Sequence, residues 1–305
     1  MSLRLATRSS NLALWQAEAA QRALEAALPG QVAELVPLKS SGDLDTTTAL
    51  ARFGRIGIFT VEVDRAVLDG RADVGVHSLK DMTTTLQDGV VLAAVLPRGP
   101  VEDVLVAEPG TTLDNLPEGA RVATGSLRRR AMLLAARPDL EIVDIRGNVE
   151  TRLSKLARGD AHALLMARAG LERLGYTDAI AEILDTRRFL PATGQGIVGL
   201  TCRDGDTETL DKLSALDDQG AWPMALAERA FLRNVQGGCN APVGAHAERA
   251  GGNLHVRARV LALDGSDSVS ASRTGPVAEA EALGEGLAQE MLDLGAGPLI
   301  DKART

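Results

Sequence analysis

Short apolar runs that alternate with helical patterns are the feature that most constrains the fold of this chain. Residues 3–7 and 32–38 read as strands, and between them apolar residues return at helical spacing from 10 to 28. The series continues with a helix at 60–69 and a mostly apolar strand at 72–78. Strands that are apolar along their whole length are covered on both faces, so this order predicts a mainly parallel sheet between helices.

A second series of the same style follows the sequence PRGP at 97–100, which interrupts the pattern and is predicted to be a hinge. The expected elements are strands at 103–107, 121–124, 141–145 and 163–167 and helices at 127–136 and 149–158. The sequence PATGQGIVG at 191–199 is predicted to return the chain between the lobes. No clear repeat of residue identities links the two series.

The last part of the chain predicts a smaller α+β domain. A helix at 225–235 leads into a loop at 237–239, alternating strands follow around 254–263, and a last helix lies near 278–294. A length of 305 residues exceeds one ordinary hydrophobic core. We therefore expect three domains, with lobe 1 at 1–96 and 197–215, lobe 2 at 101–191 and a C-terminal domain at 219–305.

Composition excludes several classes of protein. Apolar residues make up 45% and charged residues 24%, which is typical of a globular chain. A net charge of −8 and only 2% aromatic residues argue against a nucleic-acid binder. No apolar stretch is long enough to cross a bilayer and the N-terminus has no apolar signal region, so we expect a cytoplasmic protein without membrane partners. Two isolated cysteines and four dispersed histidines predict neither a disulfide framework nor a metal site.

Cationic and hydroxyl side chains cluster where predicted strands give way to helices. They are Arg8 and Ser10, then Ser78 and Lys80 beside Asp81, then Ser126, Arg128 and Arg129, and finally Arg146 and Arg152 in RGNVETR. Any one arginine can be a solvated surface charge. Guanidinium groups bind carboxylates or phosphates, and helix N-terminal amides add to the attraction. The Gly-rich phosphate loops of nucleotide sites are missing, so we expect a multiply anionic ligand with carboxylates as plausible as phosphates.

Two residues are candidates for chemistry, each with a simpler alternative. Asp81 either caps a turn or, ionised among cations, holds a cationic intermediate or relays protons. Cys239 follows two glycines and is either a reactive thiolate or an inert turn residue. His77 is expected to pack or hydrogen-bond at a strand end, and Cys202 to be a buried small hydrophobe.

Seven segments in order along the chain resemble the porphobilinogen deaminases, also called hydroxymethylbilane synthases. The segments are LATRSSNLALWQAE, SSGD, ADVGVHSLKDM, GSLRRRAML, IRGNVETRLSKL, LPATGQG and AERAFLRNVQGGCNAPVG. The fold that this resemblance implies has two α/β lobes like those of periplasmic binding proteins and a small third domain that presents the cysteine loop.

The resemblance implies a monomeric transferase of tetrapyrrole biosynthesis, the route to porphyrins and heme. Such an enzyme joins four porphobilinogens head to tail, releases ammonia and passes the linear hydroxymethylbilane to uroporphyrinogen-III synthase. Its cofactor is a dipyrromethane made from porphobilinogen, and the implied thioether attachment maps to Cys239. The implied catalytic acid and base, which contacts pyrrole nitrogens, maps to Asp81.

The resemblance also implies binding roles for the cations. The cofactor would contact Ser78, Lys80, Ser126, Arg128, Arg129, Arg146 and Gly147, and the substrate would contact Arg8, Ser10, Arg146, Arg152, Arg173 and Gln195. One segment departs from the family pattern, because Ile56 and Val61 stand where lysines are usual and only Arg55 can substitute for one. The alternative is a non-catalytic solute-binding module, which would leave Cys239 and Asp81 together without an explanation.

Overall fold

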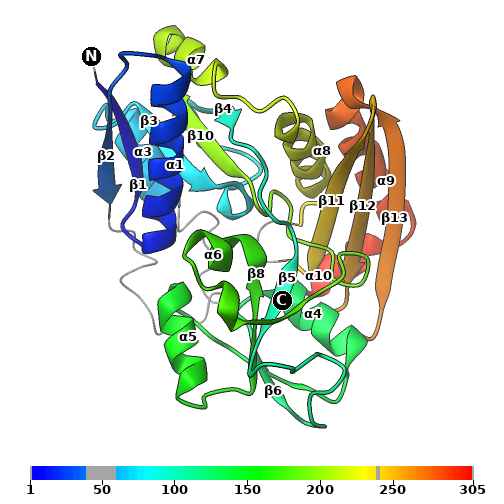
Figure 1. Ribbon diagram of the computed structural model, residues 1–305. Coiled ribbons are helices and arrows are strands. Elements are labelled where there is room, and N and C mark those ends of the chain that lie inside the picture. Colours follow the sequence, from blue (N-terminus) through cyan, green and yellow to red (C-terminus); the bar gives the residue numbers. More distant parts are fainter. Residues whose placement is uncertain (1, 39–59, 238–240, 304–305) are drawn as a thin grey trace. The chain divides into compact units, whose positions relative to one another are not determined.

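The computed structural model describes residues 2–38, 60–237 and 241–303 (Figure 1). The described residues divide into two compact units. Unit 1 contains the described residues up to Gly99 together with Gly196–Trp222, and unit 2 contains Pro100–Gln195 and the described residues from Pro223 onward. Within these ranges, every helix is too short or too polar to cross a membrane.

Unit 1 is built on one five-stranded sheet with the order β2-β1-β3-β10-β4. Its strands are β1 (Leu3–Arg8), β2 (Ala33–Leu38), β3 (Val74–Ser78), β4 (Val90–Val95) and β10 (Val198–Arg203). β10 is antiparallel to both of its neighbours, so the other four strands share one direction. The helices of the unit are α1 (Asn11–Ala27), α3 (Val61–Leu68), the 3₁₀ helix η2 (Leu79–Asp81) and α7 (Thr207–Ser214).

Helix α1 shows why these elements form. Its buried residues Ala13, Ala17, Ala20 and Leu24 recur every three or four positions, which places them on one stripe of the helix. That stripe packs with Leu5 of β1 in the core of the unit. Figure 1 shows α1 lying along β1 and β2. The helix thereby fixes the carboxyl end of β1, where Arg8 lies.

Unit 2 repeats this arrangement and adds a second sheet. The first sheet has the order β7-β6-β8-β5-β9, with β5 (Asp103–Val106), β6 (Arg121–Ala123), β7 (Glu141–Val143), β8 (Ala163–Ala167) and β9 (Ile180–Ile183). β5 is antiparallel to both neighbours. The helices around this sheet are α4 (Leu127–Ala136), α5 (Val149–Ala157), α6 (Arg168–Arg173) and the 3₁₀ helix η3 (Thr177–Ala179).

The second sheet of unit 2 is an antiparallel meander of three strands. It consists of β11 (Val243–Ala250), β12 (Asn253–Leu261) and β13 (Ser268–Pro276), accompanied by α8 (Ala221–Asn234), the 3₁₀ helix η4 (Val277–Glu279), α9 (Ala280–Asp293) and α10 (Ala296–Lys302). Alternate residues of β12 are buried, from Leu254 to Val260. They form a core with Phe231 of α8 and Leu287 of α9, and Figure 1 shows α9 beside β13.

The predicted α/β class is confirmed, because four of the five strands in each of the two larger sheets run one way and the last sheet is antiparallel with helices. Strands β4, β9 and β10 were not expected. β9 is a short edge strand, Ile180–Ile183, whose residues are partly buried or, at Ile183, exposed. Cys239, Arg55 and Ile56 lie outside the described residues, whereas Val61 opens α3. The three-domain division stays a prediction.

Close packing of α9 on α8 requires glycine at position 284. A Cβ atom on Gly284 would meet the backbone carbonyl oxygen of Ala227 and the backbone nitrogen of Phe231, which cannot move independently of α8. A Cβ on Gly286, in the same helix, would meet the end of the flexible Arg273 side chain. The two glycines therefore differ in what a methyl group would displace.

We predict that Gly284→Ala lowers the free energy of unfolding by about 1 to 3 kcal/mol, because overpacking forces the two helices apart. Gly286→Ala is the matched control and should be neutral or stabilising by up to about 1 kcal/mol, since alanine favours the helix and Arg273 can move aside. Urea unfolding followed by circular dichroism measures both. Equal effects of the two substitutions would contradict the proposed helix contact.

Candidate functional site

A small pocket in unit 1 gathers residues from the carboxyl ends of two neighbouring strands. Because β1 and β3 are parallel and adjacent, with Leu5 opposite Val74, their ends meet at one edge of the sheet. Around the pocket lie Arg8, Ser10, Leu12, Ala13, Gln16, Thr60, Val76, His77, Ser78 and Asp81. The structure thus brings together four of the residues predicted from sequence, namely Arg8, Ser10, Ser78 and Asp81.

Asp81 is placed by the 3₁₀ turn that follows β3. Ser78 ends the strand, and Leu79, which is 2% exposed, anchors the turn in the core. Asp81 is the last residue of η2 and remains half-buried at the pocket. Lys80, between them, is also half-buried. A carboxylate is therefore held on a short rigid turn beside Arg8 and two hydroxyl groups, where it can accept hydrogen bonds from a ligand.

The pocket encloses about 60 Å³, which is small compared with roughly 300 to 1,000 Å³ for typical ligand sites. It has room for one polar arm of a ligand. A molecule with two pyrrole rings would fill much more space than this.

Two further residues support this pocket. Gln16, which is 3% exposed, donates from Nε2 to Oγ of Ser78 over 2.8 Å and so fixes the hydroxyl at the strand end. His77 lies with Nε2 at 3.1 Å from Oγ1 of Thr201 and 3.2 Å from Oδ1 of the buried Asp64. The expectation of a hydrogen-bonding histidine at the strand end is confirmed. Both contacts fix side chains at the end of β3, the strand that precedes Asp81.

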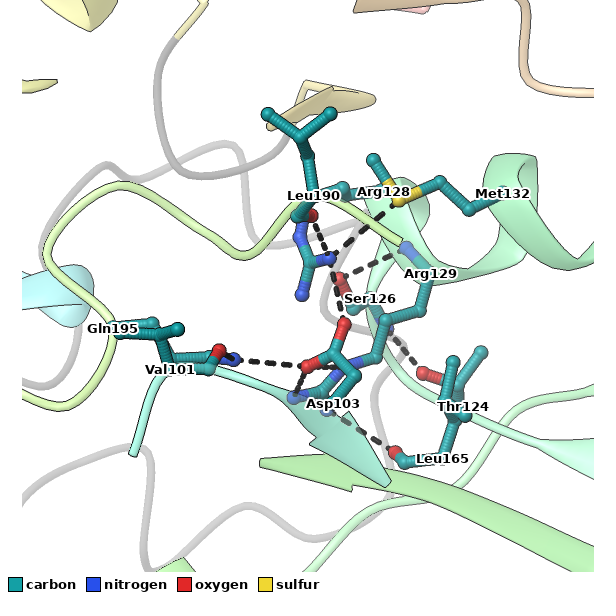
Figure 2. A network of polar contacts seen from close by, with 10 residues as sticks. All are labelled: Val101, Asp103, Thr124, Ser126, Arg128, Arg129, Met132, Leu165, Leu190 and Gln195. Carbon is teal, nitrogen blue, oxygen red and sulfur yellow. Dashed lines mark hydrogen bonds and ion pairs between the residues drawn. The ribbon is translucent and has the colours of Figure 1, made fainter. Parts of the chain in front are cut away.

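Unit 2 contains a buried network centred on Asp103, the first residue of β5 (Figure 2). Its carboxylate, which is 0% exposed, forms ion pairs of 2.7 Å with Nη1 of Arg128 and 2.8 Å with Nη2 of Arg129. Gln195 donates from Nε2 to the same carboxylate over 3.0 Å and to the carbonyl of Val101 over 2.6 Å. Three of the predicted site residues are therefore joined by one acid.

Burial and the mutual charges of Asp103, Arg128 and Arg129 shift the pKa values of Asp103 and Arg128. Burial alone would raise the pKa of Asp103, but the charges and hydrogen bonds of Arg128 and Arg129 hold it well below its usual range. Burial lowers the pKa of Arg128, and Asp103 opposes that shift only in part. One carboxylate faces two guanidinium groups. The two positive charges outweigh the cost of burying Asp103, whereas the single negative charge does not offset the cost of burying Arg128. Arginine nevertheless stays protonated at neutral pH.

Ser126 and the two arginines also form the start of α4. Ser126 is the N-cap, and its Oγ accepts from the backbone nitrogen of Arg129 over 3.4 Å. The first turn of a helix carries partial positive charge. The cap therefore places both arginine side chains at the positive end of α4, where a negatively charged ligand is favoured.

The RGNVETR segment forms a turn that opens α5. Asn148 caps the helix by accepting from the backbone nitrogen of Thr151 over 3.0 Å. Gly147 has a φ of 111°, and its carbonyl accepts from Nε of Arg152 over 2.8 Å. Arg146 and Arg152 are half-buried. A side chain at Gly147 would collide with Thr151, so glycine keeps this turn open.

Two predicted residues remain to be placed. Arg173 ends α6, and burial lowers its pKa. Cys239 lies outside the described residues, as does the segment with Arg55 and Ile56. The individual roles of the predicted residues stay predictions.

Sequence reasoning missed Asp103, Gln16 and Asp64. Asp103 begins the sequence DVLV, in which every residue is buried, and an acid within such a strand requires a cationic partner. Gln16 lies three positions after Ala13 on the buried stripe of α1. In both cases a polar residue in an apolar pattern was the available signal. The partner of each could not be found without the fold.

Comparisons with known proteins agree along the whole chain. A family model described as "Porphobilinogen deaminase, dipyromethane cofactor binding domain" matches residues 3–211, and one described as "Porphobilinogen deaminase, C-terminal domain" matches residues 222–293. A porphobilinogen deaminase from Syntrophotalea carbinolica is 44% identical over 299 residues, which is 98% of this chain and 95% of that protein.

Solved structures with a related arrangement are more distant. A putative methionine-binding lipoprotein from Bacillus subtilis is 12% identical with a TM-score of 0.44, covering 72% of this chain and 91% of that one. The periplasmic VFT2 domain of BvgS from Bordetella pertussis is 16% identical with a TM-score of 0.43, covering 70% and 86%.

The described residues fit a dipyrromethane cofactor that carries carboxylate arms. The Arg128 and Arg129 pair has one buried acid for two cations, and Nε of Arg128 is buried with no hydrogen-bond partner in the described part of the chain. Such a site leaves positive charge to be balanced by an anion. Arg128, Arg129 and Ser126, with Ser78 and Lys80 in unit 1, are donors of the kind that carboxylates require.

We predict that Asp103→Asn lowers the free energy of unfolding by about 3 to 5 kcal/mol at neutral pH, because two buried cations lose their counter-charge. The folded pKa of Asp103 is below the unfolded value of about 3.9, so the contribution is complete above that pH and is lost as the pH falls through the folded pKa. The difference between wild type and variant should therefore be largest near pH 7 and shrink below about pH 4. Urea titrations between these pH values measure it.

The matched control is Asp139→Asn. Asp139 forms a two-bond pair with Arg137 just beyond the C-terminal end of α4, where the two side chains are 27% and 18% exposed. The hydrogen bonds of Arg137 lower the pKa of Asp139 to about 2. Its substitution should cost much less stability, because solvent screens the pair. A loss at Asp103 no larger than at Asp139, or one that does not change with pH, would contradict the prediction.

Proposed function

The chain belongs to the porphobilinogen deaminase family, and we propose that Asp81 is the residue of its active site that manages charge and protons during the reaction. The activity of the chain is that of a hydroxymethylbilane synthase. It is a transferase of porphyrin and heme biosynthesis that joins four porphobilinogens head to tail and releases ammonia. It uses a dipyrromethane cofactor. By the family resemblance, this cofactor would supply the free pyrrole carbon to which the first substrate unit is joined.

One observation supports the role of Asp81. The pocket in unit 1 places this carboxylate beside Arg8, Ser10 and Ser78 at the ends of β1 and β3. A pyrrole whose carboxylate arm is bound by Arg8 would direct its ring nitrogen toward the neighbouring acceptor. Oδ of Asp81 can then accept the pyrrole N–H and stabilise positive charge on the ring as the amine departs. The same oxygen can carry the proton that the joining carbon releases.

The arginines perform the binding part of the reaction. We propose that Arg8, Arg146, Arg152 and Arg173, with Ser10 and Gln195, bind the carboxylates of the substrate, and that Lys80, Ser78, Ser126, Arg128, Arg129, Arg146 and Gly147 contact the cofactor. Holding two reactants in attack geometry can remove on the order of 7 to 11 kcal/mol of a barrier in favourable cases. Fixed guanidinium groups suit this task, because they bind a carboxylate in one orientation.

We also propose that Cys239 is a permanent tether for the cofactor rather than a nucleophile in each turnover. The other cysteine is unsuitable, because burial, followed by the charge of Asp206, raises the pKa of Cys202 to about 11 and keeps the thiol protonated. By the same resemblance, we propose that the chain works as a monomer in the cytoplasm and that uroporphyrinogen-III synthase receives its product.

We predict that Asp81→Asn keeps the fold and the cofactor but lowers kcat by about 100-fold to 10,000-fold, the usual contribution of a general acid or base. Release of hydroxymethylbilane from porphobilinogen measures kcat, and circular dichroism checks the fold. Asp88→Asn, an exposed residue of the same segment, is the control and should keep kcat within about twofold. An Asp81→Asn protein with substantial turnover would remove this residue from the mechanism.

We predict that the purified protein is heavier than its chain by the mass of two pyrrole units, and that Cys239→Ser abolishes this addition. Cys202→Ala is the matched control and should retain it, since the thiol of Cys202 is buried in β10. Intact mass spectrometry of the full chain measures all three proteins. An active preparation with an unmodified mass would refute the tether, and an addition that survives in Cys239→Ser would place it elsewhere.

A further inference from the structure

The two oxygens of the Asp103 carboxylate have different partners (Figure 2). Oδ1 accepts from Arg129 Nε over 3.1 Å and Nη2 over 2.8 Å, and from Gln195 over 3.0 Å. Oδ2 accepts from Nη1 of Arg128 over 2.7 Å. Because three donors fix Oδ1, the plane of the carboxylate cannot rotate, and the direction of its bond to Arg128 is set by Arg129 and Gln195.

The two arginines differ in what they have left to offer. Arg129 uses its third nitrogen, Nη1, to donate to the carbonyl of Leu165 over 3.1 Å, so all three of its nitrogens bond to the protein. Arg128 uses Nη1 for Asp103 and for the carbonyl of Leu190 over 2.6 Å. Its Nε is buried with no hydrogen-bond partner among the described residues. Both arginines keep unused N–H groups on their terminal nitrogens, and Arg128 also keeps its buried Nε–H, so Arg128 has the larger capacity for a further acceptor.

Stability does not account for this arrangement. A buried ion pair contributes little net stability compared with well-packed apolar residues, and here one acid serves two cations. Among the described residues, Asp103 is the one acidic residue that forms ion pairs with both Arg128 and Arg129. The network is left with a net positive charge in a buried site, since Asp103 is 0% and Arg128 4% exposed. A counter-anion would complete it.

We propose that Asp103 is the positioning residue for Arg128, and that it holds this guanidinium so that its remaining donors bind a carboxylate arm of the dipyrromethane. The inference rests on the proposed binding role of Arg128 and extends it to a residue that does not itself contact the ligand. Arg129 and Gln195 act one step further away, by fixing the carboxylate that fixes Arg128. The energetic benefit is preorganisation, because the arginine loses its rotational freedom on folding and not on binding.

The test compares full-length variants by two readouts. One is the fraction of purified protein that carries the two-pyrrole addition in intact mass spectra, and the other is KM for porphobilinogen beside kcat. Asp103→Asn should lower the loaded fraction at least about fivefold, and the remaining loaded enzyme should show KM raised roughly 10-fold to 100-fold with a smaller change in kcat. Asp103→Glu keeps the charge but displaces Arg128, and should also raise KM while losing less stability.

Two controls separate positioning from a general structural effect. Asp139→Asn removes the same charge from a partly exposed pair just beyond α4, and Gly284→Ala destabilises unit 2 away from the network. Both should keep the wild-type loaded fraction and KM. If the loss of loading and the rise in KM follow only the loss of stability across Gly284→Ala, Asp103→Glu and Asp103→Asn, Asp103 acts only through folding and the inference is wrong.

Arg128→Gln distinguishes failure of this inference from failure of the proposed function. If Arg128→Gln lowers the loaded fraction while folded Asp103→Asn and Asp103→Glu do not, only the positioning role of Asp103 is overturned. If Arg128→Gln also leaves loading and KM unchanged, the proposed carboxylate site at Arg128 is wrong, and the inference is overturned with it.

Discussion

The buried carboxylate of Asp103 is the interaction on which the cationic site of unit 2 depends. It lies at the first residue of β5, immediately after the chain has crossed from unit 1, and it contacts Gln195, the last residue before the chain crosses back. The same group holds Arg128 and Arg129 at the start of α4. Asp103 thus joins β5, the segment that ends at Gln195, and the arginine pair. A displacement of β5 or of Gln195 would therefore move the arginines at the start of α4.

The sequence alone indicated that Arg8 and Asp81 follow strand ends, because the signals for strands and turns are local. Arg8 and Asp81 follow strands that the apolar pattern identifies, and parallel neighbouring strands end at one edge whatever the details of packing. The partners of buried polar groups are different, because they depend on tertiary contacts. Asp103 meets Arg128 across 25 positions and Gln195 across 92, and no spacing rule connects such residues.

The two larger sheets have the same strand order, which the sequence also did not predict. Their residue identities do not repeat, yet the orders β2-β1-β3-β10-β4 and β7-β6-β8-β5-β9 are equivalent, with the reversed strand in the fourth place. In each sheet that strand is the one the chain enters on arriving from the other unit. Alternating apolar runs reveal strands and helices but not which strand lies beside which, so the parallel class was predictable and the reversal was not.

The arginines fall into two groups whose physical settings match the two kinds of ligand in the proposed function. Arg128 and Arg129 are buried and fixed by a protein acid, which suits a cofactor that is attached once and then stays. Arg146, in a glycine-containing turn, and Arg152, in the first turns of α5, are half-buried, which suits substrate units that must arrive, react and move on. A buried, preorganised cation binds tightly but releases slowly, because most affinity differences appear in dissociation rates. A site that repeats one reaction four times requires release as well as binding. In the proposed function, the fixed cations would therefore serve the permanent group and Arg152 the growing chain, while Arg146 would contact both.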